Sequence, residues 1–369
     1  MVEYARRGLR PTIPDSDGPS LMPHPANNDA PSVSVIIAAF ADERWTDLVE
    51  AVDSVLAQSH PAQESIVVID HNAGLFARAQ AELCGVTVLA NALARGASGA
   101  RNTGVAASTS EVVVFMDDDA TADPQWLEHL ITPFRQPGVI GVGGRLEPAW
   151  STRRPRWFAP EFDWVVGGSY RGMPQRVAPI RNVWSGNMAI RREVFDAIGG
   201  FRLSFGKTGA RSRPEDTDLC LRAGALRAGT YWVFQPAALA HHKVPAARER
   251  FGFFVRRCYA EGQGKADLGA LVDRGSATSA EKSYARKVLP KGVLIGLRET
   301  LRGDPMGVAR SGVIVLGLAA ATAGMASGRI QQRRARGVRP AASPSRVQPT
   351  GPSRPGSHDG PKGADAHSR

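Results

Sequence analysis

The segment at residues 112–120, VVVFMDDDA, constrains the fold of this chain more than any other. Three valines, a phenylalanine and a methionine form an apolar run of the kind that fills a fully buried strand. Three consecutive aspartates then end the run abruptly. Because side chains alternate along an extended segment, Asp117 and Asp119 point the same way while Asp118 points elsewhere.

Two carboxylates at the carboxyl end of a buried strand suit a hard divalent cation. Mg²⁺ or Mn²⁺ is commonly held by one or two carboxylates together with the phosphate oxygens of a bound substrate. A solvated acidic turn is the alternative interpretation of the aspartate triplet. Its place directly after a buried strand favours a site for a metal and a diphosphate.

The first half of the chain alternates predicted strands with predicted helices. Apolar runs at residues 33–39, 65–69 and 86–90 predict three further buried strands, separated by segments with helical periodicity. This β-α-β-α-β order predicts right-handed crossovers. We therefore expect an α/β domain over residues 31–268, with a mostly parallel, doubly wound sheet and helices on both faces.

Polar residues follow several of these strands, and in open parallel sheets ligands bind outside the carboxyl ends of the strands. We expect these ends to line one crevice for a nucleoside diphosphate. The glycine-rich residues 95–104 offer arginines to a phosphate, although a closely packed helix start explains them equally well. Asp70 is likewise open to interpretation as a strand-end cap. The candidate donor-binding residues are Ala39, Phe40, Glu43, Asp70, Arg101, Asp117 and Asp118.

A second acidic cluster, Glu215, Asp216 and Asp218, follows Pro214 at a predicted helix N-terminus. Capping explains one acid there, because the helix dipole favours carboxylates in the first turn. It does not require three acids. A carboxylate in this position suits a general base that takes a proton from an incoming hydroxyl group.

Other segments of the second half add candidates. His241 and His242 follow a predicted strand at residues 231–234, and a neutral imidazole there would complete a metal shell, although lone histidines are more often structural. The sequence does not say which histidine would do so. Residues 150–170, rich in aromatic side chains and arginines, predict either a sugar- or lipid-binding loop or an aromatic satellite core. The acceptor-site candidates are Trp184, Ser185, Gly186 and Asn187.

The basic net charge of +11 is concentrated at the C-terminus. Residues 329–369 hold nine Lys and Arg but only two Asp, a net charge of +7, and their proline, serine and glycine content predicts a disordered tail. The rest of the chain is only mildly basic, so we expect no specific nucleic-acid binding. Three scattered cysteines predict reduced thiols and a cytoplasmic location.

The two ends predict how the chain meets membranes. Residues 1–30 contain no apolar h-region, so we expect a disordered arm and no secretory signal. Residues 269–328 predict a helical extension, and within it residues 311–328 are uncharged and flanked by arginines. This segment is interpreted as membrane-embedded or interfacial, with a small-residue core helix as the alternative.

The ordered motifs of residues 31–268 resemble those of the family 2 glycosyltransferases, inverting enzymes of the GT-A fold. They are VSVIIAAF, VVIDHN, GASGARNTG, FMDDDA, GNMAIRREVFDAIGGF and PEDTDLCLR. The layout is most similar to transferases of lipid-linked sugars, including the dolichyl-phosphate glucuronosyltransferase type. The residues to which the resemblance gives roles are Asp70 for the nucleotide, Asp117, Asp119 and His242 for Mn²⁺ or Mg²⁺, and Asp216, with Glu215 beside it, for the base.

The resemblance implies inverting transfer of a sugar from a nucleotide-diphosphate donor to a hydroxyl group of a glycan or a lipid-linked acceptor. It also implies a cytoplasmic enzyme at the inner face of the cell membrane. Two alternatives remain at this point. One is a metal-dependent nucleotidyltransferase of similar fold, which would release pyrophosphate, and the other is a non-catalytic basic module that binds membranes or nucleic acid.

Overall fold

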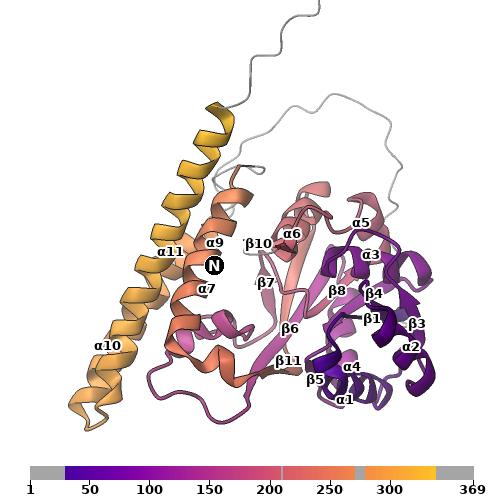
Figure 1. Ribbon diagram of the computed structural model, residues 1–369, viewed down its shortest axis with the longest axis horizontal. Helices are drawn as coiled ribbons and strands as arrows, with labels where there is room; N and C mark the ends of the chain where they lie inside the picture. The colour runs from indigo at the N-terminus through magenta and orange to yellow at the C-terminus, as the bar shows by residue number, and fades with distance from the viewer. Residues whose placement is uncertain (1–29, 209–210, 271–278, 338–369) are drawn as a thin grey trace, which may run out of the picture.

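A computed structural model describes residues 30–208, 211–270 and 279–337 of the chain. Figure 1 shows a sheet with helices packed around it and a long pair of helices along one side of the molecule. The last of these helices continues to Gly337, past the expected start of the basic tail at residue 329. The rest of that tail and the expected N-terminal arm lie outside the described residues.

The first half forms the parallel sheet that the sequence predicts. Four strands pair in parallel in the order β3-β2-β1-β4, and the first of them has the limits expected from its apolar run. The carboxyl ends of these strands therefore meet at one edge. The elements are β1 (Val33–Ala39), η1 (Asp42–Arg44), α1 (Trp45–Leu56), β2 (Glu64–Ile69), α2 (Ala73–Glu82), β3 (Thr87–Ala90), α3 (Ala97–Ala107) and β4 (Val112–Asp117).

The second half adds antiparallel strands, so the complete sheet is mixed. β8 (Asn187–Arg191) lies antiparallel between β4 and β6 (Val139–Trp150), and β11 (Tyr231–Val244) pairs in parallel with β6. The sequence predicts only the first four residues of β11. Its continuation follows a register shift between Gln235 and Leu239, an irregularity that alternation alone does not reveal.

Short elements complete this half of the sheet domain. Two three-residue strands, β5 and β7, pair antiparallel with β11, and β9 and β10 form a separate hairpin. The elements are β5 (Ala120–Ala122), α4 (Trp126–Ile131), η2 (Thr132–Arg135), η3 (Pro160–Val166), β7 (Ala178–Ile180), α5 (Arg192–Ala197), β9 (Gly206–Thr208), β10 (Arg211–Arg213), α6 (Glu215–Leu226) and η4 (Ala246–Glu249).

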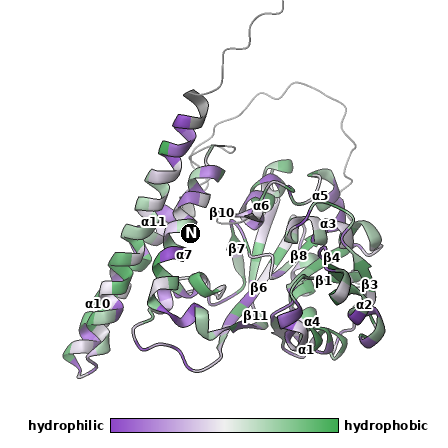
Figure 2. Cartoon of the chain, in the orientation of Figure 1, coloured by the Kyte–Doolittle hydropathy of each residue, from purple (hydrophilic) through white to green (hydrophobic). Residues whose placement is uncertain are grey.

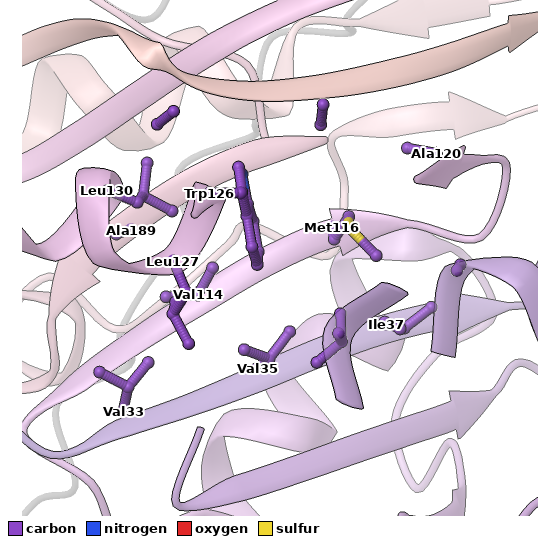
Figure 3. Packing of buried hydrophobic residues seen from close by; sticks show 14 of the residues in the cluster. Val33, Val35, Ile37, Val114, Met116, Ala120, Trp126, Leu127, Leu130 and Ala189 are labelled. Atoms are coloured by element: carbon purple, nitrogen blue, oxygen red, sulfur yellow. The ribbon is translucent and has the colours of Figure 1, made fainter. Parts of the chain in front are cut away.

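Helices cover both faces of the sheet, and each face has its own apolar core. Val33, Val35 and Ile37 of β1 lie in one core with Trp126 of α4, as Figure 3 shows. Ile36, between them in the sequence, lies in the core of the opposite face. Burial on both sides makes the strands continuous apolar runs and fixes their polar ends at the sheet edge.

A third core joins the aromatic segment to the C-terminal helices. Phe162 of η3 and Phe254 of α7 are fully buried, with ring centroids 5.3 Å apart, so the aromatic segment forms the satellite core rather than an open loop. The C-terminal elements are α7 (Phe251–Leu268), α9 (Ser279–Ser283), η5 (Tyr284–Val288), α10 (Leu289–Leu301) and α11 (Met306–Gly337).

Candidate active site

Strands β4 and β11 bring three potential metal ligands together. Asp117 ends β4, Asp119 follows it, and His242 lies near the end of β11; one ligand atom from each lies within 4.8 Å of the others. β5 pairs with β11 so that Ala120 lies opposite His242, which places Asp119 beside the imidazole. Nε2 of His242 is 3.3 Å from Oδ1 of Asp119. Two carboxylates and an imidazole are suitable ligands for Mn²⁺ or Mg²⁺.

The structure distinguishes the two adjacent histidines, because successive side chains of a strand point to opposite sides. His242 is 5% exposed and packs against Gly167, where a Cβ atom would come within 2.9 Å of the ring. His241 instead places Nε2 2.9 Å from Oδ1 of Asp123, with its side chain 38% exposed. Only His242 therefore belongs to the metal-binding cluster.

Two arginines that the sequence did not single out face the aspartates. Nη1 of Arg44 lies 2.8 Å from Oδ1 of Asp118 and 3.1 Å from Oδ2 of Asp119, while Arg248 lies 4.0 Å from Asp119. Arg44 falls just after the loop that follows β1, so the crevice argument came within one residue of it. Arg248 follows β11 and carried no sequence signal.

The electrostatics of neighbouring Asp118 and Asp119 are opposite. Burial raises the pKa of Asp118 to about 6, although Arg44 opposes the shift. Burial also acts on Asp119, but the hydrogen bond and charge of His242, together with the two arginines, lower its pKa to about 2. Asp119 is therefore held as a carboxylate within a cationic surrounding.

Asp70, at the end of β2, makes the contacts of a strand-end cap. It is 6% exposed, and its Oδ1 accepts a hydrogen bond from Nδ2 of Asn91 at 2.6 Å and lies 2.9 Å from Nδ1 of His71. Its Oδ2 accepts a hydrogen bond from the backbone N–H of Gly96 at 2.8 Å. Asp70 thus ties β2 to the loop before α3 at the edge expected to bind a nucleotide.

The other donor-site candidates after β1 differ in exposure. Ala39 is buried in the core, whereas Phe40 is 51% exposed and Glu43 is exposed in η1. The carbonyl oxygen of Phe40 accepts a hydrogen bond from Nδ2 of Asn72, which joins the ends of β1 and β2. An exposed aromatic ring at this edge offers a flat surface on which a nucleobase can stack.

Arg101 of α3 connects the two acidic centres. Its side chain is 6% exposed, with Nη2 2.8 Å from Oδ1 of Asp117 and Nη1 3.6 Å from Oε1 of Glu215. Its guanidinium group also lies 5.6 Å from the centroid of the Phe201 ring. Nε and Nη1 donate no hydrogen bond within the described residues, which leaves donors for an anionic ligand.

Glu215 and Asp216 form the second acidic centre, at the start of α6 and after Pro214. Burial, followed by the charge of Asp216, raises the pKa of Glu215 to about 7 against the opposing charge of Arg101. Burial also raises the pKa of Asp216, and Lys265 is the largest opposing charge. Both carboxylates are therefore poised to bind a proton more readily than ordinary acids.

The third acid of the cluster has a structural role. Asp218 is fully buried, and its oxygens lie 2.9 Å from Nε of Arg222 and 3.3 Å from Nη1 of Arg202. Because it is paired with two arginines and inaccessible, Asp218 stabilises the start of α6. The sequence does not separate it from its two neighbours.

Lys265 of α7 was not found from the sequence. Its side chain is 10% exposed, with Nζ 2.9 Å from Glu281 and 3.6 Å from Glu261. Glu281 also accepts two hydrogen bonds from Arg181, at 2.7 and 3.0 Å. This network fixes a cation behind the second acidic centre, and no local motif announces it because its members come from three separate segments.

The candidate acceptor residues share a turn but have different surroundings. Trp184 packs edge-on against Tyr170, with ring centroids 6.0 Å apart, and Ser185 is buried. At Gly186 a Cβ atom would lie 2.4 Å from Oδ2 of Asp117, so glycine lets the turn pass beside the metal-binding carboxylate. The turn thus adjoins the first acidic centre.

Asn187 uses its amide group within the core. Its Nδ2 donates hydrogen bonds to the carbonyl oxygens of Arg145 and Ala238, at 2.9 and 3.1 Å. Its Oδ1 accepts a hydrogen bond from Nε1 of Trp126 at 2.8 Å, and the residue is 1% exposed. The structure therefore gives Asn187 a part in joining β6, β8 and β11, which local sequence could not indicate.

Comparison with known proteins identifies related sequences and a related fold. The pattern of the family described as Glycosyl transferase family 2 matches residues 34–199. The fold resembles the mannosyltransferase PcManGT from Pyrobaculum calidifontis, solved in complex with GDP-Man and Mn²⁺. The TM-score is 0.52 at 19% identity, covering 83% of this chain and 89% of that one. The expected GT-A fold is thus confirmed.

Sequence relatives extend beyond the matched pattern. The chain is 29% identical over 229 residues to the succinoglycan biosynthesis protein ExoM of Rhizobium meliloti, covering 60% of this chain and 70% of that protein. It is 32% identical over 249 residues to the glucosyl-dolichyl phosphate glucuronosyltransferase of Haloferax volcanii, covering 66% of this chain and 79% of that protein. This chain therefore belongs to glycosyl transferase family 2 and is a glycosyltransferase, as its motifs predicted.

Proposed function

We propose that this glycosyltransferase moves a hexosyl or glucuronosyl group from a nucleoside diphosphate to a hydroxyl group of a lipid-linked acceptor, with inversion at the anomeric carbon. The observation that carries the proposal is the bridge made by Arg101 between Asp117 and Glu215. It places a cation-binding carboxylate and a proton-binding carboxylate on either side of one guanidinium group.

Asp117, Asp119 and His242 would hold Mn²⁺ or Mg²⁺. Their ligand atoms already converge, and the buried Nδ1 of His242 has no hydrogen-bond partner within the described residues. When bound, the cation would neutralise charge on the diphosphate leaving group. The solved mannosyltransferase of similar fold was crystallised with Mn²⁺ and GDP-Man, which is consistent with such a site.

Asp216 would act as the general base and accept the proton of the acceptor hydroxyl group. The acceptor oxygen then forms a bond to the anomeric carbon, and the bond from that carbon to the phosphate oxygen breaks on the opposite face. Its electron pair leaves with the nucleoside diphosphate. Arg101, Arg44 and Arg248 are placed to bind that diphosphate, because all three lie against the aspartates of the first centre.

The remaining candidates would position the two substrates. Asp70, Phe40 and Glu43 would line the nucleotide site at the edge where β1 and β2 end, with Ala39 supporting it from the core. Trp184, Ser185 and Gly186 would line the acceptor site beside Asp117. Asp118 and Asn187 would hold the surrounding strands in place.

The lipid-linked acceptor is inferred from the relative named a glucosyl-dolichyl phosphate glucuronosyltransferase. It implies work at the inner face of the cell membrane, in the cytoplasm. One helix of the described residues, over Met306–Arg334, is long and apolar enough to cross a membrane. Such a helix is weak support by itself, because core helices of soluble proteins meet the same criterion.

A donor and acceptor screen tests the proposal. Purified protein would be offered UDP-, GDP- and TDP-sugars, including UDP-glucuronate, with Mn²⁺, Mg²⁺ or EDTA, and dolichyl phosphate or glucosyl-dolichyl phosphate as acceptor. We expect metal-dependent release of a nucleoside diphosphate and a glycolipid product with inverted anomeric configuration. Release of pyrophosphate, or a product of retained configuration, would overturn it.

A further inference from the structure

Helices α10 and α11 form a hairpin along one side of the molecule, and its outer face is apolar (Figure 2). In α10 the exposed leucines are spaced three and four residues apart, so they share one side of the helix. We name the set the hairpin face, and each of its members is at least 38% exposed. The members are Leu294, Leu297, Leu301, Val308, Val315, Leu316, Leu318 and Ile330.

The opposite side of α11 is fixed to the protein at close range. A Cβ atom at Gly262 of α7 would lie 1.9 Å from the carbonyl oxygen of Ala321, and one at Gly324 would lie 1.9 Å from that of Tyr259. Nearer its start, Gly317 of α11 packs against the ring of Phe162. Glycines therefore let α11 lie directly on α7 and on the aromatic core, with backbone contact over several turns.

These contacts decide how α11 can meet a bilayer. If α11 crossed the membrane in this arrangement, α7 would enter the hydrocarbon with it, including Arg257, Glu261 and Lys265. Burying such charges in hydrocarbon costs several kcal/mol each. Only 33% of the apolar stretch is buried in the protein, so its outer side still needs an apolar surrounding. A helix lying in the plane of the membrane surface meets both conditions.

The charges around the hairpin face select an anionic surface. Glu299 and Asp304 are both paired with Arg310, at 2.7 and 2.5 Å, and α11 itself contains no acidic residue. Each exposed Lys or Arg near an anionic membrane adds about 1 kcal/mol of attraction, whereas a second copy of this chain would bring like charges together. The exposed basic residues of the two helices are Lys291, Arg298, Arg302, Arg329, Arg333 and Arg334.

We propose that the hairpin face docks this protein onto an anionic lipid bilayer, with α10 and α11 lying in the plane of the surface and not crossing it. η3 connects this surface to the catalytic centre, because its Phe162 packs on Gly317 and the following Gly167 packs on His242. Docking would thus bring the active site within one short helix of the bilayer. Its use for a lipid-linked acceptor rests on the proposed function, whereas the docking itself does not.

Vesicle flotation of the full-length protein tests the docking surface. We expect binding to vesicles of phosphatidylcholine with phosphatidylglycerol, weaker binding to phosphatidylcholine alone, and at least a tenfold loss of binding for Val315→Glu/Leu318→Glu. The matched control, Leu56→Glu/Leu226→Glu, changes two leucines that are 44% and 40% exposed on other helices and should bind as the wild type does. Equal binding by both variants would overturn the proposal, whatever the enzyme transfers.

Depth measurements separate docking in the plane from crossing. A fluorophore on single cysteines, Val308→Cys, Val315→Cys or Thr322→Cys, would be placed in a Cys84→Ser background, since the other two cysteines are buried. Quenching by spin-labelled lipids should give similar shallow depths at all three positions. A label at the bilayer centre for one position and near the headgroups for the others would show a crossing helix and overturn the proposal.

Light scattering in solution addresses a second copy as the occupant of the hairpin face. We expect a particle mass that Val315→Glu/Leu318→Glu leaves unchanged. A stable dimer that this variant dissociates, together with no vesicle binding by the wild type, would assign the face to self-association and overturn the lipid proposal.

Discussion

The two acidic centres of this molecule are chemically similar in sequence and opposite in electrostatics. In the first, His242 and two arginines hold the pKa of Asp119 at about 2 despite burial. In the second, burial and mutual repulsion raise the pKa of Glu215 to about 7 and raise that of Asp216. Carboxylates surrounded by cations bind metals and phosphates, whereas crowded buried carboxylates bind protons.

The source of the difference is tertiary. The first centre ends a buried strand and receives its cations from η1, β11 and η4. The second begins a helix, and its nearest opposing charges are the single Arg101 and the already paired Lys265. Arg101 touches both centres, so each can be altered while the other reports whether the effect is local.

The largest expected effect comes from removing the proposed base. Asp216→Asn should lower kcat by about 10³-fold, because a general base contributes roughly 10²–10⁴-fold. Donor affinity should stay within about twofold, since uniform binding is unaffected when only a transition-state interaction is lost. Released nucleoside diphosphate gives kcat, and calorimetry gives the donor Kd.

Glu215→Gln is the matched comparison for this experiment. Glu215 lies against Arg101 rather than Lys265, so its loss should cost only about tenfold in kcat, an effect of positioning rather than of proton transfer. A larger loss for Glu215→Gln than for Asp216→Asn would exchange the two roles.

The next largest effect concerns donor binding at the first centre. Asp119→Ala should raise the donor Kd measured in Mn²⁺ by about 100-fold, the upper part of the range for disrupted metal sites. EDTA should weaken donor binding by wild-type protein in the same way. Calorimetry with the donor nucleotide measures both.

His241→Ala is the control at the first centre. His241 neighbours the metal-binding histidine in sequence but bonds Asp123 at the surface. Exposed ion pairs contribute little, so donor Kd and stability should change by less than about 1 kcal/mol. If His241→Ala equalled Asp119→Ala, the distinction between the two histidines would be wrong.

Local pattern was enough for the parts of the fold that are built from continuous segments. The apolar run before the aspartate triplet could only be a buried strand, and β1 has its predicted limits for the same reason. These strands placed Asp70 and Asp117 at one edge. Because the ends of parallel strands carry the ligands in such sheets, the location of the site followed from sequence.

What the sequence could not predict depends on contacts between distant segments. Arg44, Arg248 and Lys265 read as ordinary surface charges, and only the packing of η1, η4 and α7 brings them to the acidic centres. The bend in β11 that presents His242 arises from a register shift without a local signal. Likewise, Asn187 resembles a site residue in its motif but spends its amide on three strands.

A smaller effect is expected from the cation behind the second centre. Lys265 favours the ionised form of Asp216, so Lys265→Met should raise the pKa of Asp216 further. The base is active when ionised, and the acidic limb of the kcat/KM profile should therefore move to higher pH. A shift of one unit gives about a tenfold loss on that limb and full recovery at higher pH.

Lys282→Met is the matched control, because this exposed lysine lies beside Glu281 in the same segment. Its pH profile should equal that of the wild type. A loss of activity in Lys265→Met that is the same at every pH would indicate that Lys265 only supports the packing of α7.

The smallest expected effect tests whether the two carboxylates of the second centre act as a pair. The charge of Asp216 is the second cause, after burial, of the raised pKa of Glu215. Removing that charge in Asp216→Asn stabilises ionised Glu215, so its pKa should fall from about 7 by roughly one unit, or about 1.4 kcal/mol. The carboxyl stretching band in infrared titration measures this, with Glu215→Gln identifying the band. An unchanged pKa would mean that burial alone distinguishes the second centre from the first, and that its two acids titrate independently.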